Sequence, residues 1–261
     1  MIFGAGADDL RLPVKEALAA IARLGLRDVE ADARGDISPA QLTRTGRRHL
    51  SRYLADLGLR LVALGGTAPG ASLDQQVDHA GRTLEMAREL GVEVVSVSLA
   101  DLGVRPADPA AGVGEDIMAA LRQMADRADL TARTLAVETA GVVPQVLRRL
   151  IQEVSCDRVR ACIDPAELIG SGQNLKTLYQ LADFVGLARV RDALAGRPSA
   201  PGREVPLGEG QVDLREYFMS LRDFGYRRPT LIRRRHSERP LPELLAAKKR
   251  LEELARQIEG R

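Results

Sequence analysis

One pattern recurs from one end of this chain to the other: an amphipathic helical segment, a Gly or polar break, and a short apolar run rich in Val, Ile and Leu. The apolar runs show no clean alternation with polar residues, which indicates strands buried on both faces and hence a parallel sheet. Eight such runs occur, each followed by a helical segment: MIFGAG, LRDVEAD, LRLVALGG, VEVVSVSL, RTLAVETA, VRACIDP, VGLARVRD and RPTLIRRR. Eight strand–helix units in 261 residues predict one α/β domain, residues 1–261, folded as a parallel eight-stranded (β/α)8 TIM barrel.

An open, doubly wound sheet is the alternative fold. Its usual phosphate-binding fingerprint, GxGxxG after the first strand, is absent, because GAGADD supplies only the first two glycines. No linker rich in Pro, Ser or Gly divides the chain into two domains. These features favour the barrel.

Capping residues and polar segments mark the connections between the expected elements. Ser38, followed by Pro39, predicts the start of the second helix. NLKTLYQLADF, residues 174–184, has helical spacing, and a long exposed helix is expected over residues 241–260. The longest irregular segment, about residues 193–211, follows the seventh strand, and loops of this length in compact domains are usually functional.

Composition excludes several classes of function. The 38 basic and 36 acidic residues nearly cancel, so no global charge calls for nucleic acid or a membrane surface. No apolar segment is long enough to span a bilayer, and the N-terminus lacks the pattern of a signal peptide. Cys156 and Cys162 have no metal-ligand spacing and fit a reducing cytoplasm, where we expect the protein to act. Nucleic acid is an unlikely partner because aromatic residues make up only 3% of the chain.

The ends of the expected strands carry the candidate functional residues, because a barrel builds its active site from the loops at the carboxyl ends of its strands. Glu138 is the most informative of them, since an ionised Glu inside a buried strand needs a partner. His236 is the histidine closest to the expected mouth, whereas His49 and His79 lie within helical segments. The charged residues at strand ends are Glu30, Asp32, Glu138, Asp164, Arg189, Arg191, Asp192, Arg233, Arg234 and Arg235.

Four stretches of the second half resemble the xylose isomerase-like barrel family, which includes sugar-phosphate isomerases and epimerases and endonuclease-four-type repair enzymes. They are LAVET, ACIDPAEL, ARVRDA and the long run VPLGEGQVDLREYFMSLRDFGYRRPTLI. The resemblance implies a divalent metal held by Glu, Asp, His and Glu from strands five to eight, with the two Glu residues as the acid/base pair. Glu138 and Asp164 match the first two positions. Arg189 stands at the His position, Arg233 at the last Glu position, and Glu167 where a His follows the strand-six Asp.

This departure argues against the mechanism that the resemblance implies. Arginine stays protonated and offers no lone pair, so it can neither bind a metal nor act as a general base. We therefore expect no cofactor. A divalent Mn, Mg or Zn ion, bound by Glu138 and Asp164, is expected only if the arginines do not replace the metal. A trinuclear zinc nuclease site needs several histidines and is excluded because the chain has only three.

The residues leave three functions open. The first is a diverged sugar (phosphate) isomerase or epimerase relative, metal-independent or weakly metal-binding, that binds a small anionic or phosphorylated carbohydrate-like ligand at the barrel mouth. The second is a pseudoenzyme that binds a ligand or partner without turnover, and nucleic-acid binding ranks last. Whether the protein forms a homodimer stays open. The expected catalytic residues are Glu138, Asp164, Arg189 and Arg233, and the expected ligand-binding residues are Glu30, Glu167, Arg191, Asp192, Arg203, Glu209, Arg235 and His236.

Two geometric expectations follow. Arg189 and Arg233 should point inward and pair with Glu138 and Asp164, so that two guanidinium groups replace one divalent ion. By strand alternation, Arg234 should then point to the surrounding helices or emerge at the rim of the barrel. The loop after strand seven carries Arg197, Arg203 and Glu209. Of these, Arg203 and Glu209 are expected to face the ligand.

Overall fold

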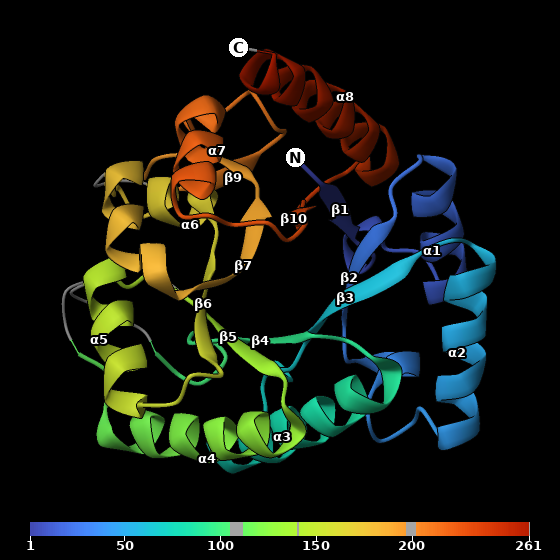
Figure 1. Ribbon diagram of the computed structural model, residues 1–261, viewed down its shortest axis with the longest axis vertical. Coiled ribbons are helices and arrows are strands. Elements are labelled where there is room, and N and C mark those ends of the chain that lie inside the picture. The colour runs from blue at the N-terminus through green and yellow to red at the C-terminus, as the bar shows by residue number, and fades with distance from the viewer. Residues whose placement is uncertain (105–111, 140, 197–201, 261) are drawn as a thin grey trace.

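The computed structural model describes residues 1–104, 112–139, 141–196 and 202–260. Eight parallel strands close into a barrel in the order β1-β2-β3-β4-β5-β6-β7-β10, with β10 beside β1 (Figure 1). They are β1 (Phe3–Gly6), β2 (Asp28–Asp32), β3 (Arg60–Gly65), β4 (Val94–Ser98), β5 (Thr134–Glu138), β6 (Val159–Ile163), β7 (Val185–Val190) and β10 (Thr230–Ile232). The TIM-barrel prediction is confirmed, and the open sheet is excluded because the sheet has no free edge.

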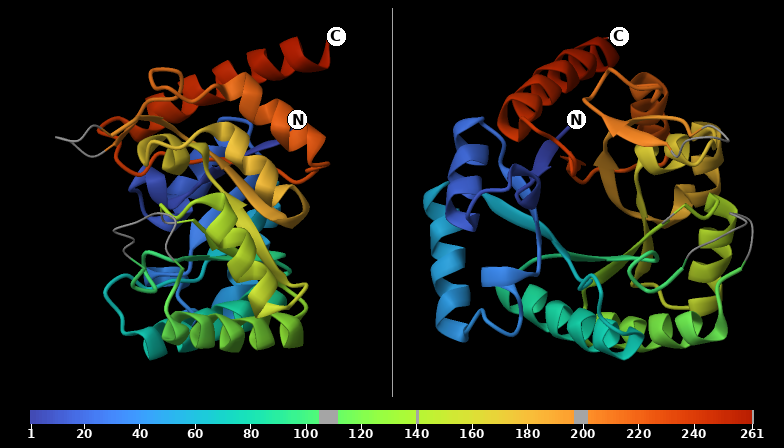
Figure 2. Two further views of the ribbon diagram at one scale, coloured as in Figure 1. Left: turned by 90° about the vertical axis from the view of Figure 1, so that its left-hand side faces the viewer. Right: turned by 180° about the vertical axis from the view of Figure 1, so that it is seen from behind.

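Helices form a ring around this barrel, and both chain ends lie on the same side of it (Figures 1 and 2). The last helix, as expected, runs along the outside of the barrel. The α-helices are α1 (Val14–Arg23), α2 (Arg44–Asp56), α3 (Leu73–Leu90), α4 (Glu115–Thr131), α5 (Pro144–Val154), α6 (Pro165–Gly170), α7 (Leu214–Asp223) and α8 (Pro240–Glu259). The 3-10 helices are η1 (Asp8–Leu10), η2 (Gly35–Ile37) and η3 (Leu175–Phe184). None of the helices among these described residues combines the length and the apolar character needed to cross a membrane.

The second helix begins later than expected. Ser38 and Pro39 do not start it. The N-cap is Thr43, whose hydroxyl oxygen accepts a hydrogen bond from the Gly46 N–H at 3.2 Å. Ser and Thr are both favourable N-cap residues, so residue type does not choose between Ser38 and Thr43, and the chain before Thr43 forms turns. Residues 175–184, expected as a helix, are helical but of the tighter 3-10 type.

The barrel interior changes from apolar to polar along the strands. Six inward positions, one on each of β3, β4, β5, β6, β7 and β10, form a small apolar cluster of Ala63, Val94, Ala136, Cys162, Leu187 and Leu231. Successive side chains of a strand alternate between its two faces, so the next inward position lies two residues further on. Those positions are Gly65, Ser96, Glu138, Asp164, Arg189 and Arg233. The apolar cluster is thus followed, two residues further along each strand, by a mostly charged layer of side chains that faces the mouth. We call it the charged level.

The segment after β7 is more regular than its sequence indicates. β8 (Asp192–Leu194) and β9 (Arg203–Val205) pair as an antiparallel two-stranded sheet above the barrel. The carboxylate of Asp192 accepts hydrogen bonds from four backbone N–H groups, that of Ala193 within β8 and those of Gly208, Gly210 and Val212 after β9, at 2.8–3.0 Å. A Cβ on Gly210 would lie 2.5 Å from Cγ of Asp192, so the glycine lets the chain wrap around the carboxylate.

Candidate functional site

The centre of the charged level is Arg189, the largest fully buried side chain of the described residues. It leaves β7 and crosses the barrel interior to three other strands. Its Nε and Nη2 donate to the Glu30 carboxylate on β2 at 3.1 and 2.5 Å, and Nη2 also donates to Ser96 Oγ on β4 at 2.9 Å. Its Nη1 lies 2.5 Å from Glu138 Oε1 on β5. One guanidinium group therefore bridges two buried carboxylates.

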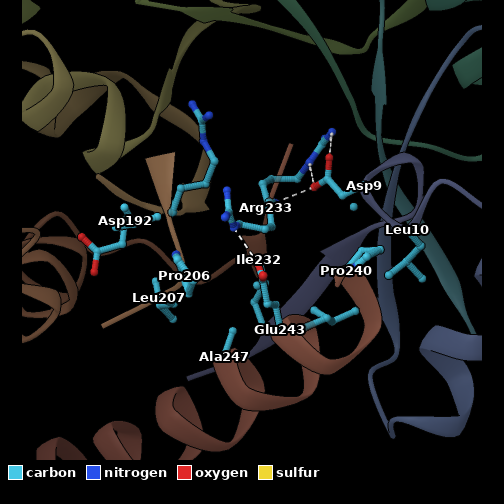
Figure 3. A pocket seen from close by; sticks show the side chains of 15 residues that line it. Asp9, Leu10, Asp192, Pro206, Leu207, Ile232, Arg233, Pro240, Glu243 and Ala247 are labelled. Atoms are coloured by element: carbon cyan, nitrogen blue, oxygen red, sulfur yellow. Dashed lines mark hydrogen bonds and ion pairs between the residues drawn. The ribbon is translucent and has the colours of Figure 1, made fainter. Parts of the chain in front are cut away.

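Arg233 reaches the same level from β10. Its Nε and Nη2 donate to the two carboxylate oxygens of Asp9 at 2.8 and 3.2 Å, and its Nη1 lies 2.6 Å from Glu30 Oε2. Figure 3 shows the Arg233 side chain extended towards Asp9. Glu30 is thus shared by both arginines. We call the five side chains Glu30, Ser96, Glu138, Arg189 and Arg233 the polar layer.

The expected pairing is therefore only partly correct. Arg189 and Arg233 point inward and Arg189 pairs with Glu138, as predicted. Arg233 does not pair with Glu138 or Asp164, and its partners are Asp9 and Glu30. Barrel closure explains the difference, because it places β1, and the Asp9 that follows it, next to β10.

Asp164 belongs to a second ion-pair cluster beside the polar layer. Its Oδ1 accepts from the Ala166 N–H at 3.0 Å and caps α6, while its Oδ2 accepts from Arg191 Nε at 2.6 Å. Nη2 of the same arginine lies 3.3 Å from Glu167 Oε1, and Glu167 also accepts from the Thr139 hydroxyl at 2.6 Å. Asp164 thus works as a helix cap and as the partner of Arg191.

Alternation at the end of β10 is as predicted. Arg234 points outward to α8, where its Nε donates to Glu243 at 2.7 Å. Arg235 points back to the mouth, where its Nη2 donates to Glu138 Oε2 at 3.3 Å. Its side chain is 38% exposed, in contrast to the buried Arg189 and Arg233.

Glu204 on β9 holds this strand end in place. Its carboxylate accepts from the backbone N–H groups of Arg235 and His236, both at 3.2 Å, and its Oε2 lies 3.2 Å from Arg234 Nη1. The sheet formed by β8 and β9 therefore supports the residues that line the mouth.

The remaining expected ligand residues lie apart from the polar layer. Asp192 is buried among backbone N–H groups, as described above. Arg203 and Glu209 are exposed, and His236 is exposed beside Arg235. Arg197 lies outside the described residues. Their contact with a ligand stays a prediction.

The ion pairs change the acidity of the buried carboxyl groups. Burial alone would raise the pKa of Glu138, but the guanidinium groups of Arg189 and Arg235 outweigh it and lower the pKa to about 2. The pKa of Glu30 also falls, because Arg189 and Arg233 outweigh the effect of burial. Glu167 shows the opposite shift, since burial and the neighbouring Asp164 raise its pKa. Glu138 is therefore held as a carboxylate of very low basicity.

Sequence reasoning missed Asp8, Asp9 and Glu204. Asp8 keeps part of its surface exposed, and its Oδ2 accepts from the Asp32 N–H at 2.6 Å. Burial of the rest of the Asp8 side chain, together with the negative charge of Asp32, raises the pKa of Asp8 to about 6. The signal for Asp8 and Asp9 was present, because the Asp-Asp pair begins two residues after the first strand ends and a closed barrel brings that strand beside the last. Glu204 had no comparable signal.

The donors assembled here do not suit a divalent metal ion. In the residues that the structure describes, no group of three His, Cys, Asp or Glu side chains is placed to hold a metal. The carboxylate oxygens of Glu138 and Glu30 face guanidinium nitrogens, which cannot act as ligands and would repel a cation.

A small cavity of about 20 Å³ lies between α8 and the end of β10, bordered by Arg233, Arg234, Glu243 and Pro206 (Figure 3). This volume holds about one water molecule and is too small for a carbohydrate.

Comparison with known proteins adds to this description. A family model of the xylose isomerase-like TIM barrel matches residues 18–257. The xylose isomerase domain protein from Planctomyces limnophilus superposes with a TM-score of 0.82 and 21% identity over 94% of each chain. The IOLI protein, in a structure with a bound zinc atom, superposes with a TM-score of 0.76 and 17% identity over 98% of this chain and 99% of that one. A xylose isomerase-like TIM barrel protein from Mycobacterium smegmatis, in complex with magnesium, superposes with a TM-score of 0.74 and 14% identity. The match covers 97% of this chain and 96% of that one. No curated protein sequence matches the chain.

These solved structures share the fold, and the sequence model covers nearly the whole chain from α1 to α8. The protein therefore belongs to the xylose isomerase-like TIM barrel family.

Proposed function

We propose that this chain binds a small anionic or phosphorylated carbohydrate-like ligand at the carboxyl-end mouth of the barrel, without a divalent metal ion. It would do so in the cytoplasm, where its two free cysteines stay reduced. The observation that carries the proposal is the solvent exposure of the Arg235 side chain at the mouth. Of the five arginines at the ends of β7 and β10, Arg235 has the most exposed side chain, and its side chain pairs with Glu138 at 3.3 Å.

A partly exposed guanidinium group is suited to an incoming anion. It can give a phosphate or carboxylate two parallel hydrogen bonds without first being pulled out of the protein interior. The exposed His236 stands next to it in the chain. Below them, the partly exposed Glu167 carboxylate can accept hydrogen bonds from carbohydrate hydroxyl groups. The mouth thus combines one anion contact with acceptors for a polyol.

Binding without turnover is the form of this proposal that the electrostatics favour. The resemblance gives Glu138 the role of acid/base, yet two arginines lower its pKa to about 2. A carboxylate of such low basicity is a poor base for abstracting a proton next to a carbonyl. The role best suited to Glu138 is to position Arg189 and Arg235.

Calorimetric titration with inorganic phosphate, a pentose 5-phosphate and the matching unphosphorylated pentose tests the proposal. The pentose phosphate should bind more tightly than the neutral pentose. Arg235→Gln should weaken its binding by about 10- to 100-fold, the value of one lost charge-assisted contact. Arg227→Gln, which changes an exposed arginine before β10 at the opposite end of the barrel, is the matched control and should leave affinity unchanged.

Equal losses in both variants, or equal affinity for the phosphorylated and neutral sugars, would contradict anion binding at the mouth. Turnover is checked in the same samples by NMR in D2O. Exchange of a sugar C–H for deuterium, or formation of an isomer, would show an enzyme and reject the form without turnover.

A further inference from the structure

We infer that Arg189 and Arg233 act as built-in cations that neutralise the buried carboxylates of the polar layer and close this position to a divalent ion. The inference deepens the proposed function, which assumes that no metal takes part. It rests on three observations: the charge balance, the geometry of the shared carboxylate, and the room made for Arg233 in β1.

The charges of the polar layer balance within the protein. Glu30, Glu138 and the adjoining Asp9 bring three negative charges. Arg189 and Arg233 supply two positive charges, and Arg235 supplies a third through its contact with Glu138. A buried carboxylate without a cation is costly, so these pairs are a condition of the fold. An added divalent ion would leave this group with two excess positive charges in a buried setting.

The geometry leaves no oxygen of Glu30 for a metal. Its Oε1 faces Arg189 Nη2 at 2.5 Å, and its Oε2 faces Arg189 Nε at 3.1 Å and Arg233 Nη1 at 2.6 Å. Glu138 is engaged in the same way, with Oε1 on Arg189 and Oε2 on Arg235. A metal could reach these oxygens only after the guanidinium groups had moved away.

The strand opposite Arg233 is shaped to receive it. A Cβ on Gly6 of β1 would lie 2.6 Å from Cδ and 2.8 Å from Cζ of Arg233, closer than such atoms approach in proteins. The Arg233 side chain therefore passes over Gly6 in contact with the backbone. Space for the guanidinium group is thus provided by the neighbouring strand, in addition to the charges that hold it.

The decisive experiment exchanges the two arginines for the residue types that the family resemblance places there. Arg189→His combined with Arg233→Glu removes both cations. It also adds two side chains that can bind a metal together with Glu138 and Asp164. Mn²⁺ and Zn²⁺ are titrated into the wild type and the double variant, with calorimetry and the melting temperature as readouts. We expect no tight site in the wild type and a one-to-one site in the double variant. Its Tm should rise by about 5–10 °C at a metal concentration roughly 100-fold above Kd.

The single variant Arg189→Gln keeps the inference testable if the double variant does not fold. Loss of one cation leaves Glu30 and Glu138 with excess negative charge, so Mn²⁺ should raise the Tm of this variant and leave the wild type unchanged. Arg227→Gln serves again as the control, since it lies outside the barrel interior.

The outcomes separate this inference from the proposed function. Tight one-to-one Mn²⁺ or Zn²⁺ binding by the wild type would overturn the inference, whatever the ligand results. An Arg189→Gln variant that has the same Tm as the wild type, and whose Tm does not change when metal is added, would also overturn the inference. Loss of the Arg235 effect on pentose phosphate binding would overturn only the proposed ligand, because neither readout used here involves a sugar.

Discussion

Adding a single methyl group at Gly6 should destabilise this barrel severely, although the same change is usually harmless in a strand. Gly→Ala in a strand or helix interior normally gains about 0.5–1 kcal/mol, because alanine loses less conformational freedom on folding. At Gly6 the new Cβ would lie 2.6 Å from Cδ of Arg233 and force that side chain away. Arg233 would then release Asp9, which it holds through two hydrogen bonds.

The expected size follows from these two effects. Breaking a buried ion pair while leaving its partner charged costs about 3–5 kcal/mol. Subtracting the usual gain of about 0.5–1 kcal/mol leaves a net loss of about 2–4 kcal/mol for Gly6→Ala. Urea denaturation followed by circular dichroism measures this change in the free energy of unfolding.

The matched control is Gly81→Ala in α3, where the nearest atom to the new Cβ would be Arg127 Cγ at 3.6 Å, an ordinary contact. This variant should be as stable as the wild type or about 1 kcal/mol more stable. A double-mutant cycle isolates the cause. In an Arg233→Ala background, Gly6→Ala should cost almost nothing, because the obstructed side chain is gone. A loss that persists in that background, or a wild-type-like Gly6→Ala, would refute the reasoning.

Three further changes test the surrounding charges. Asp192→Ala should cost more than about 3 kcal/mol and speed hydrogen exchange at residues 208–212, since four backbone N–H groups lose their acceptor; unchanged exchange there would argue against the structural role of Asp192. The pKa of Asp8 is raised to about 6 in the folded state, so the folded protein holds this proton longer than the unfolded chain. The stability of the wild type relative to Asp8→Asn should therefore fall as pH rises from about 4 to about 6, measured by urea titrations at each pH. The pKa of Glu138 is lowered to about 2, so its contribution is present above about pH 4.5 and lost on acidification. The stability gap between wild type and Glu138→Gln should narrow between about pH 4.5 and pH 2, and a gap that does not depend on pH would contradict the ion pairing.

The strands were predictable because each is a compact run of apolar residues, long enough for one strand and bounded by Gly or polar breaks. The inward placement of Arg233 was predicted from the need to pair buried carboxylates, and the outward placement of Arg234 then followed from alternation. Helix α2 was placed too early, because Ser38 and Thr43 are both good N-caps and only tertiary packing chooses between them.

The partners of the arginines were harder to predict. Charge balance predicted Glu138 and Asp164 as the partners of Arg189 and Arg233, which is correct for Arg189 and Glu138 but misses Asp9 and Glu30, the partners of Arg233. Asp9 lies 224 residues from Arg233 in the sequence, and only closure of the barrel makes them neighbours. Glu204 belongs to a sheet that the irregular, Gly- and Pro-rich segment after β7 did not indicate.

The charges of the polar layer and Asp9 are divided between the two halves of the chain. The first half, through β4, contributes Asp9 and Glu30, two negative charges. The second half contributes Glu138 together with Arg189, Arg233 and Arg235, a net charge of two positives. Neither half-barrel could bury its own share without leaving charge unpaired, which is costly in a protein interior. The two halves are therefore bound to fold as one cooperative unit, and separately produced halves should attract each other and complete the barrel on mixing.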